Sequence, residues 1–323
     1  MLANMLIPPT LFFALGFIAH LVRSDLKFPA DVGKAASIYL LVGIGLHGGM
    51  EMAKADFAAA SSAVIAAIGL AVATPLLAFS ILRVFGHIDR LNAAAIAAHY
   101  GSVSAGTFLT AVAFLDTQQV EHETYPLIML AIMESPAIII GLLLARWGGD
   151  LVNQNGGADG LKHLLREAFT NGSVVLLFGS ILIGLVATPA SLAKILPLFD
   201  TLFMGVLCLF LLEMGLEAAK RIGDFRRVGL FLVVFGIAMP LLGAVIGLIV
   251  GHYVLGFSVG GTTLVAVLTA SASYIAVPSA MRLAIPEANP SFYLTLALGV
   301  SFPFNVVFGI SLYYYAARWL AGA

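Results

Sequence analysis

Long apolar runs separated by short polar connections dominate the chain. Runs of about 20 apolar residues, the length that spans a bilayer as an α-helix, recur ten times. They centre on residues 6–22, 35–51, 57–85, 91–115, 125–147, 170–188, 198–217, 228–253, 260–285 and 291–319. The pattern predicts an all-α integral membrane protein with ten transmembrane helices. The first run lacks a basic region and a cleavage site, which predicts a first span rather than a removed signal peptide.

The longest polar connection divides the ten runs into two groups of five. It covers residues 148–167 and is rich in Asn, Gly and Asp. We therefore expect a first five-helix repeat over residues 1–147, a cytoplasmic linker over 148–167, and a second five-helix repeat over 168–323.

Short stretches of the first half return in the second half at a nearly constant spacing of 165 to 169 positions. The matching pairs are Gly49–Lys54 with Gly215–Lys220, Pro75–Leu77 with Pro240–Leu242, Gly86–His87 with Gly251–His252, Ser102–Ser104 with Ser271–Ser273, and Pro136 with Pro303. Because each half holds an odd number of spans, the second half must enter the membrane inverted relative to the first. The sequence predicts a 5+5 inverted repeat, an architecture typical of secondary transporters.

The fourth and ninth runs are each interrupted by small and hydroxyl-bearing residues. The fourth contains Gly-Ser-Val-Ser-Ala-Gly-Thr over 101–107, and the ninth contains Ser-Ala-Ser-Tyr-Ile-Ala-Val-Pro over 271–278. Non-helical backbone at membrane depth persists only where protein or a wet cavity covers it. Two broken spans at corresponding places in the two halves are the best sequence indication of a transporter's binding site.

Each interruption is expected to end one half-helix and begin another, and Pro278 suits the first turn of a restarted helix. Facing half-helix N-termini offer free N–H groups and partial positive charge to a small anion. The expected substrate-binding residues are Gly101, Ser102, Val103, Ser104, Ala105, Gly106, Thr107, Ser271, Ala272, Ser273, Tyr274, Ile275 and Ala276. The alternative is that both stretches are small-residue packing faces of ordinary helices.

Glu134 in the fifth run is the ionisable residue that most strongly suggests an ion site, because a carboxylate within a membrane is costly and usually faces a cavity. It can hold Na⁺ or a proton. The corresponding stretch of the second half offers the neutral oxygens of Ser301 and Asn305, which suit a hard cation. The expected Na⁺ ligands are Glu134, Ser104, Thr107, Ser271, Ser301 and Asn305. The alternative role for Glu134 is that of a protonated packing residue bonded to a neighbouring span.

Composition and charge narrow the class further. The chain is 61% hydrophobic and 10% charged, whereas soluble domains carry about 25% charged residues. The net charge is −1 and the sequence has no basic tail, so it lacks the clustered positive charge that binds nucleic acid. A single cysteine, Cys208, excludes disulfides within the chain and thiolate metal clusters. The spans carry neither a His-Glu-x-x-His motif nor a pair of aspartates, so we expect no enzyme activity and no cofactor other than Na⁺ as coupling ion.

The distribution of Lys and Arg predicts the orientation. Of the sixteen basic residues, only Lys54, Lys194 and Arg318 fall on one side of the predicted membrane. The side that carries these three residues is therefore expected to face away from the cytoplasm, and both termini lie on that side. The expected location is a bacterial inner membrane.

At several long stretches the chain resembles the bacterial sodium-dependent bicarbonate transporter family. The resemblance covers most of the chain and is densest over residues 100–107, 133–137, 214–227, 240–242, 256–261 and 282–290. It implies a trimeric permease with ten spans, in which a core bundle moves against a gate bundle and an anion enters with Na⁺. It also implies that anion and Na⁺ bind where spans four and nine cross.

Two features depart from the family. At the second interruption, family members that import bicarbonate have a sequence similar to Ser-Ser-Ser-Asp-Ile-Ser-Gly-Pro-Pro. This chain has Tyr274 in place of the acidic residue, Ala276 in place of a hydroxyl-bearing residue and Val277 in place of a glycine. The connection at 148–167 also lacks the long insert of members regulated by a PII-like cytoplasmic protein, so that partner is not expected here.

These observations predict a secondary active transporter that imports a small anion, with bicarbonate as the first candidate, together with Na⁺. One alternative keeps the fold and carries another small carboxylate or couples to H⁺. An alternative from another class is a membrane receptor that binds an anion without transporting it; such a receptor binds saturably without flux.

Overall fold

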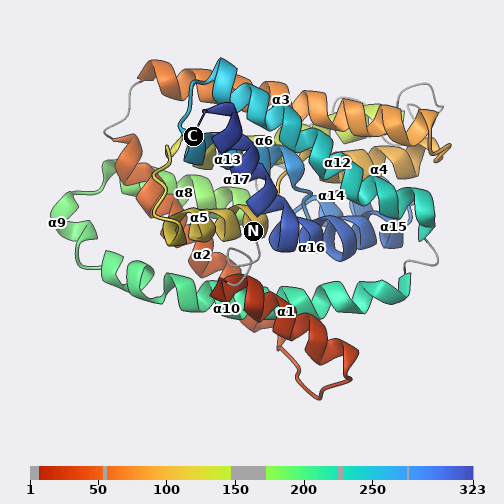
Figure 1. The fold of residues 1–323 in the computed structure, drawn as a ribbon, viewed down its shortest axis with the longest axis horizontal. Helices are drawn as coiled ribbons and strands as arrows, with labels where there is room; N and C mark the ends of the chain where they lie inside the picture. The colour runs from red at the N-terminus through yellow and green to blue at the C-terminus, as the bar shows by residue number, and fades with distance from the viewer. Residues whose placement is uncertain (1–6, 54–56, 147–171, 225–227, 275, 323) are drawn as a thin grey trace.

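A computed structural model describes residues 7–53, 57–146, 172–224, 228–274 and 276–322, and these residues form helices without a strand. Figure 1 shows the helices packed side by side, with α1 and α10 along one edge and α3 and α12 along the opposite edge. The linker predicted at 148–167 lies outside the described residues.

The helices of the first half correspond closely to the first five apolar runs. Their bounds are α1 Pro8–Leu21, α2 Ala30–Met52, α3 Phe57–Val84, α4 Arg90–Gly101, α5 Ala105–Thr117 and α6 Tyr125–Arg146.

The second half holds more and shorter elements. They are α8 Gly172–Val186, α9 Pro189–Leu192, α10 Leu196–Lys220, the 3₁₀ turn η3 Arg221–Asp224, α12 Leu230–Ile249, the π-helix η4 Val250–Val254, α13 Val259–Ala270, α14 Ala276–Ala284, α15 Pro290–Leu294, the π-helix η5 Thr295–Ser301, α16 Phe302–Phe304, the π-helix η6 Asn305–Gly309 and α17 Ile310–Leu320.

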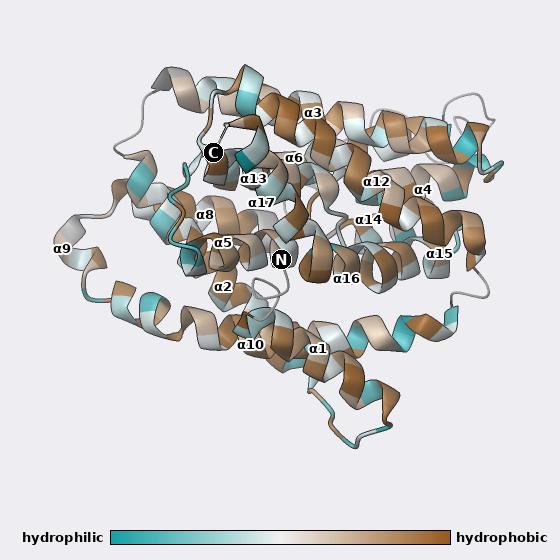
Figure 2. Cartoon of the chain, in the orientation of Figure 1, coloured by the Kyte–Doolittle hydropathy of each residue, from teal (hydrophilic) through white to brown (hydrophobic). Residues whose placement is uncertain are grey.

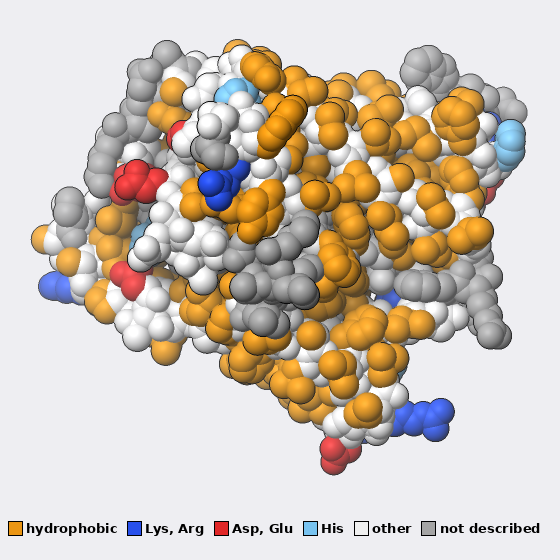
Figure 3. Space-filling view, in the orientation of Figure 1, with side chains coloured by type: hydrophobic (Ala, Val, Ile, Leu, Met, Phe, Trp, Pro, Cys, Tyr) orange, Lys and Arg blue, Asp and Glu red, His pale blue; other side chains and the backbone are white. Residues whose placement is uncertain are grey.

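The helices have the length and surface of a multi-pass membrane protein. Within the described part of the chain, six helical segments are long and apolar enough to cross a bilayer, and the helices at 8–21, 175–186 and 259–270 are shorter but apolar. In Figure 2 the helices are mostly brown, and teal gathers at helix ends and loops. Figure 3 shows hydrophobic side chains over most of one face, with most charges toward its edges. An outward apolar surface of this kind suits lipid rather than water.

The structure breaks the fourth and ninth runs, as the sequence predicted. Residues 102–104 separate α4 from α5, and residues 271–275 separate α13 from α14. The first break is shorter than the predicted one because Gly101 still ends α4 and Ala105 already begins α5. Pro278 lies in the first turn of α14, where its missing N–H costs nothing.

The last apolar run is not the continuous α-helix that the pattern predicted. Two π-helical segments, η5 and η6, flank the three residues of α16. Pro303 in α16 has no N–H to donate to the preceding turn, and π-helical turns often mark functional positions inside helices. Hydrophobic periodicity alone does not distinguish these turns from an α-helix.

Short polar side chains cap the helices that bound the two breaks. Asp89 accepts from the Asn92 amide at the start of α4 (3.0 Å), and Ser258 accepts from the Gly261 amide at the start of α13 (3.3 Å). Such caps satisfy amides that have no partner within the helix. Both broken spans therefore begin at a defined residue.

Each capped helix start is tied to the other half of the chain. The Glu123 carboxylate, just before α6, accepts from the amide (2.7 Å) and hydroxyl (2.9 Å) of Ser258. At the start of α15, the Asn289 amide donates to the Asn92 side chain (2.7 Å). These two links connect the halves and fix where the breaks lie relative to each other.

Glycines allow two helix pairs to approach closely. A Cβ at Gly16 of α1 would meet the carbonyl of Leu212 on α10, and a Cβ at Gly215 of α10 would meet that of Phe13 on α1. On the second pair, Gly49 of α2 packs in the same way against the backbone of α8. Small residues at such contacts are typical of helix packing in membranes. The pairs α1 with α10 and α2 with α8 are thus tightly packed units.

Candidate functional site

The two breaks touch each other in the interior of the protein. The Ser104 amide donates to the Ser271 hydroxyl (2.9 Å), and the Ser273 amide donates to the carbonyl of His99 (2.8 Å). All four residues are buried. Each break thereby satisfies backbone groups that the other leaves without a helical partner, which is how irregular backbone survives at membrane depth.

Hydroxyls also organise the ends of the half-helices. The Ser104 hydroxyl caps α5 by accepting from the amide (3.1 Å) and the hydroxyl (2.9 Å) of Thr107. The Ser271 hydroxyl donates to the Leu268 carbonyl at the end of α13 (2.9 Å). Ser104 and Ser271, which the sequence identified as candidate ligands, therefore also hold the half-helix ends in place.

A small cavity lies between the two breaks. Its volume is about 20 Å³, and its lining residues are Ser37, Leu41, Val103, Ser104, Ala105, Leu130, Glu134, Leu177, Ser273 and Tyr274. A single water needs about 10–15 Å³ measured in this way. The cavity therefore has room for a water molecule or a bare cation, and a carbon-containing anion needs the lining to move.

Glu134 is the acidic residue in this lining. It lies on α6, two residues before Pro136, which sits inside the helix. Proline cannot donate to the carbonyl four residues earlier, so the carbonyl of Ile132 loses its usual helical donor next to Glu134. A carboxylate, a freed carbonyl and serine hydroxyls are hard oxygen ligands of the kind that alkali and alkaline-earth cations prefer.

The structure brings together part of the residue set expected from the sequence. Val103, Ser104, Ala105, Ser273 and Tyr274 line the cavity with Glu134. The rest of the set lies close by in the chain without lining it, and this group comprises Gly101, Ser102, Gly106, Thr107, Ser271 and Ala272. Ile275 and the side chain of Ala276 lie outside the described residues.

Ser301 and Asn305, expected as cation ligands, make bonds elsewhere. The Ser301 hydroxyl donates to the Gly236 carbonyl (2.6 Å) and pairs with the Tyr100 hydroxyl (2.6 Å). The Asn305 amide donates to the Ala270 carbonyl at the end of α13 (2.8 Å) and its oxygen accepts from Tyr313 (2.7 Å). In this arrangement Asn305 holds the end of the half-helix α13 against the π-helical span, and Ser301 links that span to α12 and α4.

The cavity also includes residues that the sequence did not single out. Ser37 and Leu41 come from α2, Leu130 from α6 and Leu177 from α8. These residues carry no local signal, because each lies in an unbroken apolar run and only the packing of distant helices brings it to the site. Ser37 is a polar group contributed from outside the two breaks.

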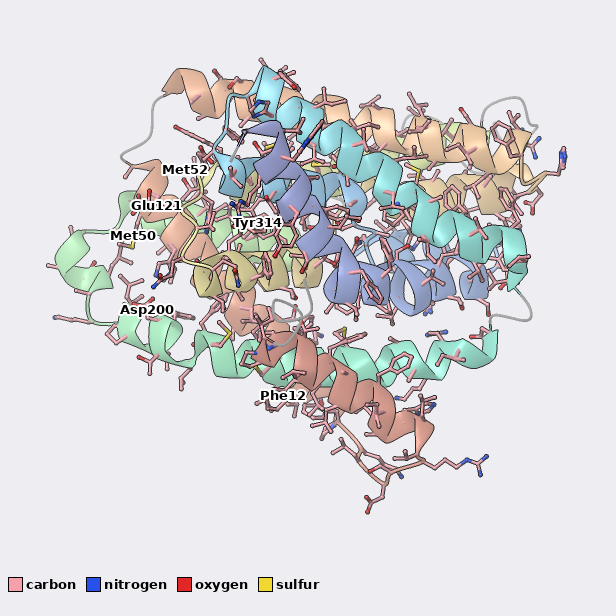
Figure 4. All side chains as sticks on the ribbon, in the orientation of Figure 1. Phe12, Met50, Met52, Glu121, Asp200 and Tyr314 are labelled. Carbon is pink, nitrogen blue, oxygen red and sulfur yellow. The ribbon has the colours of Figure 1, made fainter. Side chains whose placement is uncertain are left out.

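A larger cavity of about 350 Å³ opens at one end of the molecule. Its lining residues are Ile44, His47, Gly48, Phe108, Val112, Asp116, His122, Glu123, Thr124, Leu127, Phe199, Asp200, Phe203 and Leu264. Figure 4 places Glu121, Asp200, Met50 and Met52 at this end. His47 bonds to Asp200 (2.8 Å) and His122 pairs with Asp116 (3.7 Å). Because Phe108 lies in the first turn of α5, directly after the first break, this cavity approaches that break.

We expect the protonation of His122 to depend on Asp116. Burial lowers the pKa of His122, but bonding to Asp116 and to the Glu123 carbonyl, with the charges of both acids, raises it by more, so the net pKa lies above 6.5. This pair therefore stabilises the fold fully below pH 6.5, and the contribution is lost as pH rises through the folded pKa. Asp116→Asn should lower the His122 pKa, because burial still disfavours the charged ring and the Asp116 carboxylate no longer stabilises it. NMR titration of labelled histidines measures this pKa.

Asp200→Asn is the matched control for this change. This change removes a carboxylate that lines the same cavity but pairs with His47 instead of His122. It should leave the His122 pKa above 6.5. An unchanged His122 pKa in Asp116→Asn would contradict the assignment of Asp116 as its partner.

Comparison with known protein families identifies the chain. The family model described as the Na⁺-dependent bicarbonate transporter superfamily matches residues 8–318. The chain belongs to this superfamily. No curated protein matches it. Membership confirms the resemblance seen in the sequence and supports Na⁺ as the coupling ion. It also points to a multi-pass membrane protein of a transporter superfamily rather than to an enzyme.

Proposed function

We propose that this chain is a secondary active transporter that imports a small anion, with bicarbonate as the first candidate, together with Na⁺. The observation that carries the proposal is the contact of the two breaks around one cavity that also holds Glu134. Hydroxyls and backbone amides of the breaks would bind the anion, and Glu134 with neighbouring neutral oxygens would bind the cation. Within the described residues, clusters of three or more His, Cys, Asp or Glu side chains suited to a metal are absent, so a single carboxylate with neutral ligands favours a monovalent ion.

Ten spans arranged as a 5+5 inverted repeat form part of the proposal. The packing of α1 against α10 has its counterpart at the repeat spacing in the packing of α8 against α2, and Gly215 and Gly49 occupy corresponding contacts. The links from Glu123 to Ser258 and from Asn289 to Asn92 correspond in the same way. This symmetry supports alternating access by one bundle moving against the other.

In this arrangement α1, α2, α8 and α10 would form the gate bundle and the remaining spans the core bundle. The bias of Lys and Arg supports an orientation with both termini outside the cytoplasm of a bacterial inner membrane. The large cavity with His47 and His122 would then open to the outside, between the bundles. A homotrimer follows from the family resemblance.

Uptake of labelled bicarbonate by proteoliposomes tests the function. We expect an inward Na⁺ gradient to stimulate uptake severalfold over a matched K⁺ gradient. Stimulation by a proton gradient alone would support H⁺ coupling instead, and competition by short carboxylates would identify another cargo. Saturable binding without flux under all gradients would contradict transport and favour a receptor.

A further inference from the structure

Tyr274 lines the small cavity and packs against side chains of α10 and α16. Its ring packs edge-on against Phe302 of α16, with 5.1 Å between ring centroids and an interplanar angle of 67°. Its hydroxyl lies over Gly106, where a Cβ would collide with that oxygen and would lie 2.9 Å from the ring of Phe210 on α10. Gly106 in the first turn of α5 and Tyr274 in the second break are therefore matched in shape.

The Tyr274 hydroxyl is buried beside Ser104, but no described residue lies in full hydrogen-bonding geometry with it. An unpaired buried hydroxyl is costly, and native proteins rarely tolerate it without a functional reason. This hydroxyl borders the cavity that also contains Ser104, Ser273 and Glu134. It is thus placed to bond with whatever enters the cavity.

A tyrosine changes the chemistry of this position in two ways. Its neutral hydroxyl donates one hydrogen bond, whereas a carboxylate there would accept only and would repel an anion next to Glu134. Its ring also forms part of the wall of the cavity and limits the volume to about 20 Å³. A larger cargo must displace more of this ring, and close-packed interiors resist such displacement.

We propose that Tyr274 is the specificity-determining residue of the site, donating a hydrogen bond to an oxygen of the cargo and restricting the cargo to compact one-carbon oxyanions. The inference rests on the proposed function, since it assumes that the cavity binds the transported anion. Bicarbonate and formate fit this class, whereas acetate and propionate add carbon atoms that meet the ring.

Anion binding to the purified full-length protein tests this role. Calorimetry would compare bicarbonate, formate, acetate and propionate in the presence of Na⁺. Tyr274→Phe keeps the ring and should weaken binding of bicarbonate and formate by roughly tenfold, the factor for one hydrogen bond worth about 1.4 kcal/mol. Tyr274→Ser removes the ring and should raise the affinity for propionate relative to formate by at least about tenfold.

Tyr293→Phe is the matched control. The Tyr293 hydroxyl is also buried, but the Tyr293 ring stacks on the His99 ring and the residue does not line the cavity. It should leave all four affinities unchanged. Equal affinities for wild type and Tyr274→Phe, or an unchanged order of anions in Tyr274→Ser, would overturn the inference.

A double variant tests the geometry independently of any ligand. Gly106→Ala should lower the melting temperature, because the new methyl group collides with the Tyr274 hydroxyl. Adding Tyr274→Phe removes that oxygen and should recover part of the loss. No recovery would contradict the assigned contact.

Failure of the inference and failure of the proposed function give different results. Anion binding that responds to Tyr274 without uptake by proteoliposomes would reject transport and keep the specificity role. Uptake by the wild type with anion selectivity that is insensitive to Tyr274 would keep transport and reject the specificity role. Absence of binding by all four anions, in wild type and variants alike, would reject both.

Discussion

Replacing Glu134 by Gln should raise the Na⁺ concentration needed for half-maximal uptake by at least about tenfold. Glu134 is the acidic residue in the lining of the cavity between the two breaks, and Gln keeps its shape while removing the charge. A charge-assisted interaction is worth about 1.5–3 kcal/mol, and every 1.4 kcal/mol is a factor of ten in affinity. Initial uptake rates by proteoliposomes at graded Na⁺ concentrations measure the change.

Glu121→Gln is the control for this prediction, because Glu121 is exposed on the loop before α6 and does not line the small cavity. It should leave the Na⁺ dependence unchanged. Equal Na⁺ dependence of wild type and Glu134→Gln would assign Glu134 a packing role. A variant that gains Na⁺-independent uptake while losing its response to pH would instead indicate that Glu134 carries a proton.

Ser271→Ala should reduce both stability and uptake. The Ser271 hydroxyl accepts from the Ser104 amide of the other break, and both residues are buried. Removing the hydroxyl leaves a buried N–H group unpaired, which costs about 1–3 kcal/mol. The two breaks also lose a bond that holds them together, so we expect a lower melting temperature and a loss of uptake greater than the loss of folded protein.

Thr263→Val on α13, the helix that ends just before Ser271, is the matched control. The Thr263 hydroxyl is buried but donates only to the Val259 carbonyl of its own helix, so Val leaves no amide without a partner. Its effect on melting temperature should be smaller and its uptake close to wild type. Similar losses in the two variants would show that the bond between the breaks has no special role.

Much of the fold could be predicted from the sequence because membrane spans leave a strong one-dimensional signal. The helix bounds follow the apolar runs, and the two breaks coincide with clusters of small and hydroxyl-bearing residues, which compete with regular helix hydrogen bonding. The π-helical turns around Pro303 could not be predicted, since an extra residue in a turn leaves hydrophobicity unchanged. The close contacts at Gly16 and Gly215 depend on which helices meet, which composition does not specify.

The candidate site could be predicted only in part. Ser104, Ser273 and Glu134 could be predicted because hydroxyl-bearing or charged residues are unusual in an apolar run, and Val103 because it lies between two serines. Ser37 has the same chemistry but lies on an unbroken span, so only packing reveals its place.

Two further residues show how tertiary contacts decide the role of a polar side chain. Ser301 and Asn305 have suitable oxygens, yet they bond to the Gly236 and Ala270 carbonyls. Hydroxyls and amides serve equally as ligands and as partners of freed carbonyls. Sequence alone does not separate the two uses.

The most direct test of the site is a structure of the protein determined with saturating Na⁺ and bicarbonate. We predict density for an anion between Ser104 and Ser273, with the Tyr274 hydroxyl in hydrogen-bonding distance and a cation next to Glu134. Anion density elsewhere, with the space between the two breaks unchanged under conditions that support uptake, would contradict the account.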